Sequence, residues 1–475
     1  MSKDLRDFLE KAKAENELQE IEGADWNLEL GTITELVAEK NGPALIFDKI
    51  KDYPPGYRVA VNLYTSKRRI AIAMGIDPDT PALEMVKMWR ARDFKPVKPI
   101  EVKSGRVMEN VILGDDINLL KFPVPRWHEF DGGRYMGTGH VVIMRDPDEG
   151  WINLGVQRAV VHDEKTLGLY ISPGKHNRII MEKYFAKGQN CPVVMAFGPE
   201  PLTYLSGCMH VPWGISEFDW AGRMRNEPVE VMKGEFTGIP FPADDEIVIE
   251  GECIHPDVEL RDEGPFGEWT GYYGGGRLPR PIVRVKAIYH RNNPILASFP
   301  PLKPPIPRFG VPVLSAPAIW NDLDNAGVTG IKGVWQLYSG GGRLLTVISI
   351  KQEHAGHAKQ AAMVAAGGHG GGYMGRYVIV VDDDIDPTNA EEVLWAIATR
   401  CEPENSIDIL RDCWGTPLDP LLPPEKRRNK DYSHSLAILN ACRPFSWKDE
   451  FPVVNKASDE LRSKVIKKWG KEIGY

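Results

Sequence analysis

Two carboxylates stand at the ends of a short turn in the sequence Glu-Gly-Pro-Phe-Gly-Glu at residues 263–268. Because glycine and proline favour tight turns, this segment is expected to bring the side chains of Glu263 and Glu268 into one space. Carboxylates held close together do not both ionise easily, so one of them can stay protonated at neutral pH and donate a proton. A solvated acidic turn is the alternative, but aromatic neighbours favour partial burial. These neighbours are Phe266, Trp269, Tyr272 and Tyr273.

A second segment, Ser-Pro-Gly-Lys-His at residues 172–176, lies between a predicted strand and a predicted helix. A glycine-containing turn that opens a helix points free N–H groups outward, and with Lys175 and His176 beside them it suits a phosphate group. A plain helix start with a solvated lysine explains these residues equally well.

The predicted strand at residues 151–158 also contains three polar side chains among its apolar ones, namely Asn153, Gln157 and Arg158. Outward surface residues are the commoner explanation. On a regular strand Asn153 and Arg158 differ in parity and would face opposite sides of the sheet.

Glu217 stands among aromatic residues at a predicted helix start, in residues 216–222. An acid favoured there by the helix dipole is the commoner explanation. Asn153, His176 and Glu217 together would form a mixed nitrogen and oxygen set that can hold a divalent cation against a phosphate. Their separation in the sequence leaves open whether they meet.

Two tempting motifs are set aside. Residues 370–375 match the pattern G-x-G-x-x-G but follow a predicted helix and precede a strand, the reverse of the dinucleotide-binding context, so we interpret them as a flexible connection. His354 and His357 have metal-like spacing without an evident third ligand, and we interpret them as surface residues.

The elements that position these segments fall into three regions of the chain, which differ in their predicted helices and strands. Residues 1–99 mix short helices and strands and end in a proline-rich connector, which predicts an N-terminal α/β domain. Residues 100–300 carry many short strands, the last at 295–299, and predict a β-rich central domain. A proline-rich linker at 301–312 leads to residues 313–475, a second α/β domain.

The final predicted helix carries Leu461, Val465 and Trp469 on one stripe. Such a stripe is expected to pack on a neighbour, either in the same chain or in another subunit.

Composition excludes several classes of protein. The chain has 475 residues, 42% of them hydrophobic and 26% charged, which is typical of a globular protein with two or three domains. A net charge of −8 gives no support for binding nucleic acid or anionic membranes. With no long apolar stretch and no secretory signal at the start, we expect a cytoplasmic protein without membrane insertion. The six cysteines form no C-x-x-C pair and are expected to be reduced.

The four polar segments, in this order, resemble the UbiD-like family of reversible non-oxidative decarboxylases, which use prenylated flavin mononucleotide. The resemblance runs over most of the chain, and the block at 263–268 is its most specific element. The acidic strand end at 377–386, Thr399-Arg400 and residues 417–420 also fit the family pattern.

The resemblance implies roles for individual residues. Asn153, His176 and Glu217 would hold the divalent metal, usually manganese, that clamps the flavin phosphate, and potassium is an additional candidate ion. For the phosphate-binding lysine that the family places in its C-terminal half, Lys351 and Arg376 are both candidates. The residues that would line the cofactor are Asn153, Leu154, Gly155, Val156, Gln157, Arg158, Lys175, His176 and Glu217.

Arg158, Glu263 and Glu268 match the catalytic network of the family. Loss of CO₂ from an sp² carbon leaves a carbanion that side chains cannot delocalise, so a cofactor must act as the electron sink. We assign Glu268 as the general acid and Arg158 as the group that binds the substrate carboxylate and pairs with Glu263, which tunes both.

The family fold is a central split β-barrel of flavin-reductase type flanked by an N-terminal α/β domain and a C-terminal α/β domain used in oligomerisation, an α+β architecture. The expected activity is that of a carboxy-lyase, the reversible decarboxylation of an aromatic, heteroaromatic or α,β-unsaturated carboxylic acid. The implied partners are this acid, CO₂, a flavin prenyltransferase as cofactor supplier, and further copies of the chain in a dimer or hexamer. The alternative is a flavin- or nucleotide-binding protein of similar barrel fold without decarboxylase activity.

Overall fold

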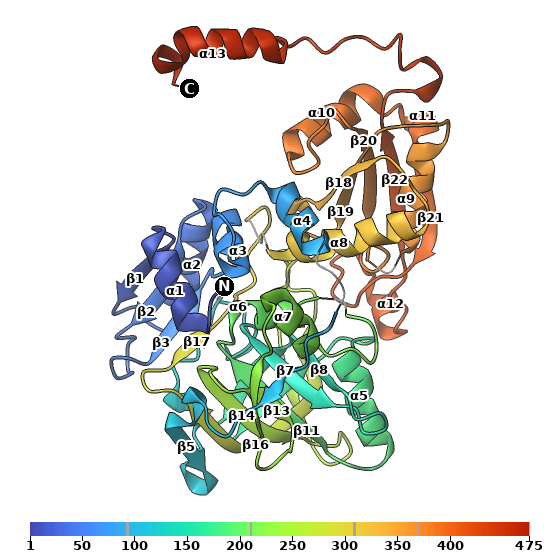
Figure 1. Cartoon of the computed structure of the whole chain (residues 1–475). Helices are drawn as coiled ribbons and strands as arrows, with labels where there is room; N and C mark the ends of the chain where they lie inside the picture. The colour runs from blue at the N-terminus through green and yellow to red at the C-terminus, as the bar shows by residue number, and fades with distance from the viewer. Residues whose placement is uncertain (92–94, 210, 307–309, 369, 475) are drawn as a thin grey trace.

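The protein is described here from a computed structural model, which defines residues 1–91, 95–209, 211–306, 310–368 and 370–474. Three sheet-based bodies follow one another along the chain, from the blue N-terminal body through the green central body to the orange C-terminal body in Figure 1. The predicted α+β class, a central barrel flanked by two α/β regions, is confirmed. Among the helices in these ranges, none combines the length and the apolar character that crossing a membrane requires.

The N-terminal body is built around a four-stranded sheet in the order β1-β2-β3-β17. Its strands are β1 (Leu18–Glu22), β2 (Ala44–Asp48), β3 (Arg58–Val61) and β17 (Ile295–Ala297). The helices of this part of the chain are α1 (Leu5–Ala14), α2 (Glu29–Glu39), α3 (Lys67–Met74) and α4 (Ala82–Ala91). The helical spacing of apolar residues in α1 follows from its packing, because Leu5, Phe8, Leu9 and Ala12 are all buried.

One strand belongs to a different sheet from the one predicted. The strand expected at 295–299 in the central region pairs in parallel with β3 and so belongs to the N-terminal sheet. A three-residue strand carries no local pattern that selects its partner, since pairing depends on residues far away in the sequence. Helix α4 also reaches beyond its own body and packs on α8 (Gly310–Asn325), where Arg90 Nε donates to Asn321 Oδ1 at 2.8 Å.

The central body is a curled ten-stranded sheet that runs along the path β6-β9-β10-β16-β14-β11-β7-β8. Along its 13 residues β16 (Leu278–His290) pairs with β15, β10, β14 and β5, always antiparallel. A strand that changes partners in this way curls the sheet into a half-barrel, and a register shift after Glu250 adds to the bend.

The other strands of this sheet are β5 (Asn110–Leu113), β6 (Arg134–Tyr135), β7 (His140–Arg145), β8 (Ile152–Gly155), β9 (Arg158–Asp163), β10 (Thr166–Tyr170), β11 (Cys191–Phe197), β14 (Ile247–Cys253) and β15 (Leu260–Glu263). A small sheet contains β4 (Ile100–Glu101), β12 (Glu230–Lys233) and β13 (Pro240–Pro242). The helices are α5 (His176–Ala186), α6 (Pro201–Gly207) and α7 (Glu217–Arg225).

The C-terminal body is a five-stranded sheet in the order β18-β19-β20-β22-β21. Its strands are β18 (Ile331–Gln336), β19 (Leu345–Ile350), β20 (Tyr377–Asp382), β21 (Ile407–Cys413) and β22 (His434–Ala441). Its helices are α8, α9 (His357–Gly367), α10 (Ala390–Arg400), α11 (Pro403–Ser406), α12 (Pro424–Arg428) and α13 (Asp459–Ile473).

The linker predicted at 301–312 is shorter in the structure, because α8 already begins at Gly310. Pro312 lies in the first turn of this helix, where a missing N–H group is tolerated. Residues 307–309 of the predicted linker lie outside the described residues.

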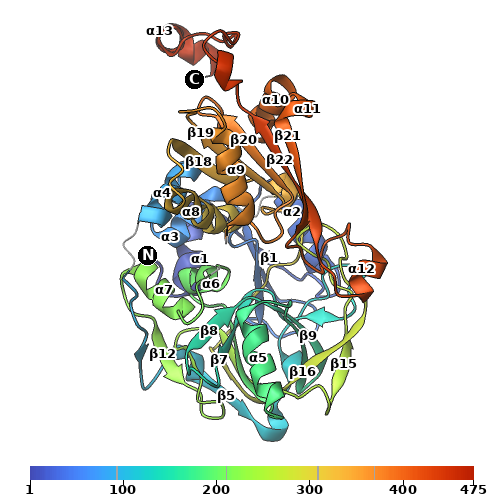
Figure 2. The same cartoon turned by 90° about the vertical axis from the view of Figure 1, so that its right-hand side faces the viewer.

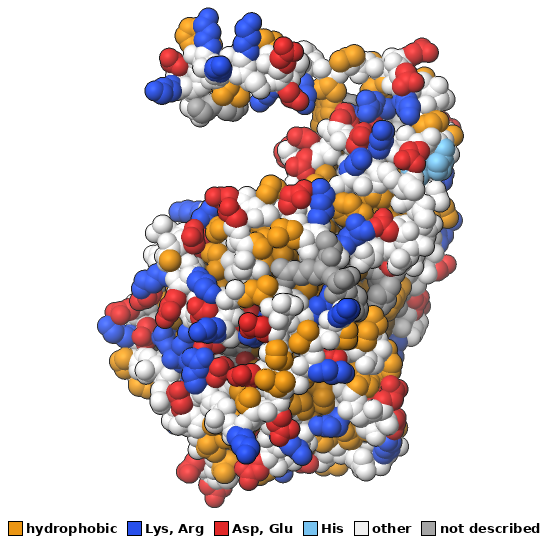
Figure 3. All heavy atoms as spheres, in the orientation of Figure 1, with side chains coloured by type: hydrophobic (Ala, Val, Ile, Leu, Met, Phe, Trp, Pro, Cys, Tyr) orange, Lys and Arg blue, Asp and Glu red, His pale blue; other side chains and the backbone are white. Residues whose placement is uncertain are grey.

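Helix α13 stands clear of the C-terminal body at the end of an extended segment in Figures 1 and 2, and Figure 3 shows hydrophobic side chains among the charged ones on its surface. The predicted stripe of Leu461, Val465 and Trp469 is exposed, with Trp469 at 48%. Among the described residues, the stripe therefore does not pack on the rest of its own chain.

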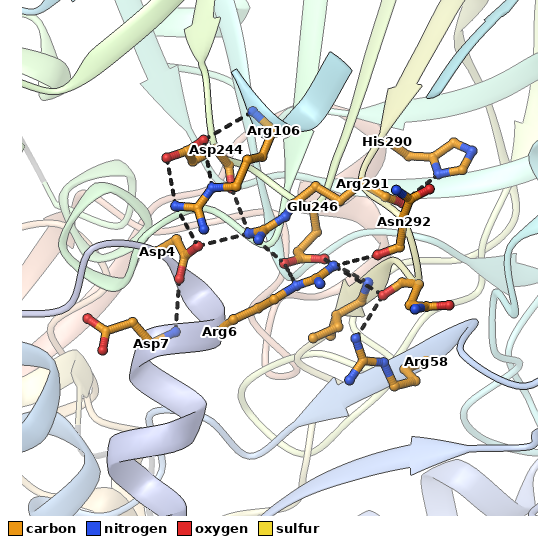
Figure 4. A network of polar contacts seen from close by, with 12 residues as sticks. Asp4, Arg6, Asp7, Arg58, Arg106, Asp244, Glu246, His290, Arg291 and Asn292 are labelled. Atoms are coloured by element: carbon orange, nitrogen blue, oxygen red, sulfur yellow. Dashed lines mark hydrogen bonds and ion pairs between the residues drawn. The ribbon is translucent and has the colours of Figure 1, made fainter. Parts of the chain in front are cut away.

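Buried charges fasten α1 to the central sheet, as Figure 4 shows. Glu246 is fully buried and accepts from Arg6 Nε and Nη2, both at 2.8 Å, and from Arg291 Nη1 at 3.2 Å. Asp4 caps α1 by accepting from the backbone N–H of Asp7 at 2.8 Å, and its other oxygen accepts from Arg291 Nη1 at 2.9 Å. A buried charge is stable only when paired in this way, so the network fixes the position of α1 on the sheet.

Candidate active site

A cavity of about 350 Å³ lies between the central and the C-terminal bodies. All nine residues predicted to line a cofactor line this cavity, and Glu268 lines it as well. The C-terminal body contributes Gly341, Arg343, Tyr373, Met374, Trp414 and Leu418. The cavity is thus shared by two bodies, which the four sequence segments, all from the central region, did not indicate.

Arg158 joins the two carboxylates of the predicted turn. Its Nη2 lies 2.7 Å from Glu263 Oε2, and its Nη1 lies 2.6 Å from Glu268 Oε1. The guanidinium is largely buried, which disfavours its charge, but the negative charges of Glu263 and Glu268 outweigh burial and raise the pKa of Arg158. One cation therefore holds both acids at the cavity, Glu268 in the lining and Glu263 behind it.

The backbone of the turn brings the two acids together. Glu263 is the last residue of β15, and Gly264 has a φ of 91°, a conformation that side-chain-bearing residues rarely adopt. A β-carbon at this position would lie 2.7 Å from the carbonyl oxygen of Gly276. The predicted close approach of Glu263 and Glu268 thus depends on glycine at this position.

The parity conflict between Asn153 and Arg158 is resolved by a break in the strand. Strand β8 ends at Gly155 and β9 begins at Arg158, so the two residues are not on one regular strand. Both side chains line the cavity. The interpretation as outward surface residues is wrong for this segment, since Asn153, Gln157 and Arg158 are all buried.

The three residues predicted to hold a metal lie at one part of the cavity. Asn153 Oδ1 lies 3.2 Å from His176 Nδ1, and the Asn153 amide donates to Asn177 Oδ1 at 2.7 Å, which orients its oxygen toward His176. Glu217 Oε2 accepts from the backbone N–H of Leu154 at 2.7 Å.

Glu217 is a buried acid, and in the described part of the chain no Lys or Arg lies within ion-pair distance of it. Burial raises the pKa of Glu217 to about 8, although backbone hydrogen bonds oppose this rise. A buried carboxylate of this kind beside an imidazole and an amide oxygen is a donor set suited to a divalent cation.

Two cations face the cavity from different bodies. Lys175 precedes the first residue of α5, as the turn at 172–176 predicts, and Arg343 comes from the loop before β19. Burial and the positive charge of Arg343 lower the pKa of Lys175 to about 8. Two cations that repel each other across a cavity suit an anion between them.

Neither predicted candidate for the phosphate-binding lysine lines the cavity. Lys351 is exposed beyond the far end of β19, and Arg376 forms an ion pair with Asp419. Arg343 follows the run Gly340-Gly341-Gly342, and this glycine-rich stretch beside a cation is the signal that could have identified it.

The segment 370–375 is a connection, as predicted, since it lies between α9 and β20, and its Tyr373 and Met374 also line the cavity. The interpretation of His357 as a surface residue is wrong, because its side chain is buried at the start of α9, where its Nδ1 accepts from the backbone N–H of Glu353 at 3.2 Å. Within the described ranges no three His, Cys, Asp or Glu side chains group into a metal site.

Comparisons with known proteins agree with this arrangement. Three family models described as the N-terminal, Rift-related and C-terminal domains of 3-octaprenyl-4-hydroxybenzoate carboxy-lyase match residues 9–89, 98–304 and 312–438. The chain belongs to the UbiD family of carboxy-lyases. A pyrrole-2-carboxylic acid decarboxylase of Pseudomonas aeruginosa is 32% identical over 98% of this chain and 97% of its own length. A phenolic acid decarboxylase of Bacillus subtilis is 32% identical over 88% of this chain and 89% of its own length.

Solved UbiD structures share the fold over nearly the whole chain. The UbiD-class enzyme HmfF from Pelotomaculum thermopropionicum, in complex with FMN, matches with a TM-score of 0.85 at 28% identity, over 96% of this chain and 98% of that one. The vanillic acid decarboxylase of Sedimentibacter hydroxybenzoicus in open form also gives 0.85 at 28% identity, over 99% of this chain and 100% of that one. The split-barrel architecture is therefore that of the family.

Proposed function

We propose that the protein catalyses the reversible, non-oxidative decarboxylation of an aromatic, heteroaromatic or α,β-unsaturated carboxylic acid with prenylated FMN as cofactor. The observation that carries the proposal is the ion-paired arrangement of Glu263, Arg158 and Glu268 at the wall of the cavity. The names of the pyrrole-2-carboxylic acid and phenolic acid decarboxylases support an aromatic or heteroaromatic substrate.

The residues of the cavity fit a flavin nucleotide. Its volume of about 350 Å³ lies in the range of cofactor sites. Aromatic side chains suit a ring system, and Lys175 with Arg343 suits a phosphate. When bound, the prenylated ring supplies the electron sink for the carbanion that CO₂ loss creates.

Asn153, His176 and Glu217 would hold a divalent cation, with manganese as our candidate, next to the phosphate. The buried Glu217 side chain supports this assignment. Its pKa is raised because burial disfavours the negative charge of the carboxylate, and a bound cation would stabilise that charge. We further propose that Lys175 and Arg343 bind the phosphate from opposite bodies.

Arg158 binds the substrate carboxylate and fixes the two acids. A planar guanidinium can meet a carboxylate through two N–H groups, and Tyr170, whose ring centroid lies 4.4 Å from Arg158 Cζ, keeps its plane in place. After CO₂ leaves, Glu268 delivers a proton to the carbon that carried it, because Glu268 is the acid that lines the cavity.

Purification after co-expression with a flavin prenyltransferase tests the proposal. The visible spectrum identifies the bound flavin, and CO₂ release is measured with a panel of pyrrole-2-carboxylate, hydroxybenzoates and cinnamates. We expect prenylated FMN and CO₂ release from at least one acid. Ordinary FMN without CO₂ release from any acid would favour the alternative, a flavin-binding protein of the same fold.

We also propose that the enzyme works as a homo-oligomer, with α13 of one chain packed on another. The exposed stripe of Leu461, Val465 and Trp469 supports this assembly.

A further inference from the structure

Tyr135 contacts the catalytic network from behind. It lies on β6 with its side chain fully buried, and its hydroxyl donates to Glu263 Oε1 at 3.0 Å. The other oxygen of Glu263 accepts from Arg158 Nη2 at 2.7 Å. Each oxygen of Glu263 therefore has its own donor.

This arrangement separates the roles of the two acids. A protonated carboxyl group must donate through one of its oxygens, and both oxygens of Glu263 already face donors. Glu268 lines the cavity, and its Oε1 accepts from Arg158 Nη1 at 2.6 Å. Because Glu268 is the acid of this pair that lines the cavity, it keeps the role of proton donor, while Glu263 serves as the acceptor that aligns Arg158.

Several contacts fix Tyr135 against the turn. The ring centroids of Tyr135 and Phe266 are 4.0 Å apart. Two residues before β6, the backbone N–H of Gly132 donates to the carbonyl of Pro265 at 2.8 Å. A β-carbon on Gly132 would lie 2.0 Å from the carbonyl oxygen of Gly264, so the two backbones are in close contact. The segment before β6 thus packs against the backbone of the turn that holds both acids.

The hydroxyl of Tyr135 is available as a donor at all working pH values. Burial, followed by the charge of Glu263, raises the pKa of Tyr135 far above its ordinary range. The other charged or titratable groups whose charges act on Glu263 or Tyr135 are Asp131, Arg158, His162 and Arg280.

We propose that Tyr135 is a positioning residue of the decarboxylase, which holds Glu263 as a hydrogen-bond acceptor for Arg158 and so leaves Glu268 as the proton donor. The proposal rests on the proposed function, because it assigns a role within that reaction.

The test compares Tyr135→Phe with Tyr289→Phe in the holoenzyme. Tyr289 is a matched control, since it is a buried tyrosine of the same sheet whose hydroxyl donates to Glu250 Oε1 at 2.8 Å, away from the cavity. We expect Tyr135→Phe to lower kcat about tenfold with KM within about twofold, and to move the acid limb of the pH–rate profile up by about one pH unit. The reason is that a carboxylate that loses a donor takes up a proton more readily. Tyr289→Phe should leave the profile unchanged.

A fluorinated tyrosine incorporated at position 135 gives a second readout without loss of side-chain volume. Its more acidic hydroxyl is a stronger donor, so the acid limb should move in the opposite direction, to lower pH. A profile that stays in place in both Tyr135 variants, while the wild-type enzyme releases CO₂, overturns the role of Tyr135 alone. Absence of CO₂ release from the loaded wild-type enzyme would instead overturn the proposed function.

Discussion

At the scale of single residues, the site depends on a buried arginine between two acids. Arg158 meets Glu263 and Glu268 through separate nitrogens, which a lysine cannot reproduce with its single Nζ atom. The turn chemistry of residues 263–268 predicted the meeting of the two acids. For Arg343 the only local signal is the glycine run before it, and for Tyr135 we find none, because both residues reach the site from positions that tertiary packing sets.

Replacement of Arg343 tests the phosphate site. We expect Arg343→Gln to weaken FMN binding about 10- to 100-fold, because one charge-assisted contact is lost, and to leave binding of riboflavin, which lacks the phosphate, unchanged. Fluorescence titration of both flavins measures the two affinities. Lys351→Gln is the control and should bind both flavins like the wild type. Equal losses for FMN and riboflavin in Arg343→Gln would contradict a phosphate contact.

The raised pKa of Glu217, about 8, predicts the pH dependence of metal binding. Below this pH the acid is mostly protonated, and a cation must displace the proton. We therefore expect Mn²⁺ affinity in the flavin-free protein to rise about tenfold per pH unit toward pH 8 and then level off. Calorimetry at pH 7 in buffers of different ionisation enthalpy should report close to one proton released.

Substitution controls identify the group that releases this proton. Glu217→Gln should abolish the binding and Asp219→Asn, two residues along α7, should retain it. Binding that is independent of pH between 6 and 8 would contradict the assignment of Glu217.

At the scale of elements, the sequence predicted the strands on which the site residues lie. It did not predict where one strand ends and the next begins. The break between β8 and β9 turns Asn153 and Arg158 toward one cavity, and periodicity alone predicts opposite faces for them. Strand β17 joins the N-terminal sheet for the same kind of reason, since short strands choose partners through contacts that lie far apart in the sequence.

The buried charges around α1 make a prediction about stability. Glu246→Ala leaves Arg6 and Arg291 without their shared carboxylate, and we expect the free energy of unfolding to fall by about 3–5 kcal/mol. Urea denaturation followed by circular dichroism measures this loss. Glu20→Ala, which removes a surface ion pair with Lys13, should cost less than about 1 kcal/mol. A similar small cost for Glu246→Ala would contradict the role of the network.

At the scale of the whole molecule, the cavity depends on two bodies. Gly341 lies against the ring of Trp269, the residue after Glu268, and Arg343 follows two positions later. The same short loop of the C-terminal body therefore touches the catalytic turn and supplies a cation to the cavity. The sequence predicted both bodies, but which residues face each other across the cavity depends on their packing.

The exposed stripe of α13 predicts a homo-oligomer. We expect light scattering of the wild-type protein to give a multiple of the chain mass of 53.2 kDa. Leu461→Glu combined with Trp469→Glu should lower this mass, because charges on the stripe oppose its burial. A control pair on the polar side, Lys464→Glu and Lys471→Glu, should keep the oligomer. A monomeric wild-type protein would contradict the assembly.

The most direct test of the proposed mechanism is CO₂ release by the Glu268→Gln enzyme loaded with prenylated FMN. We expect turnover to fall by about 10²- to 10⁴-fold, since the amide cannot deliver a proton, while the spectrum of the bound cofactor stays unchanged. Asp262→Asn, next to Glu263 but exposed to solvent, should retain wild-type turnover. Wild-type rates of CO₂ release from the Glu268→Gln enzyme would contradict the account.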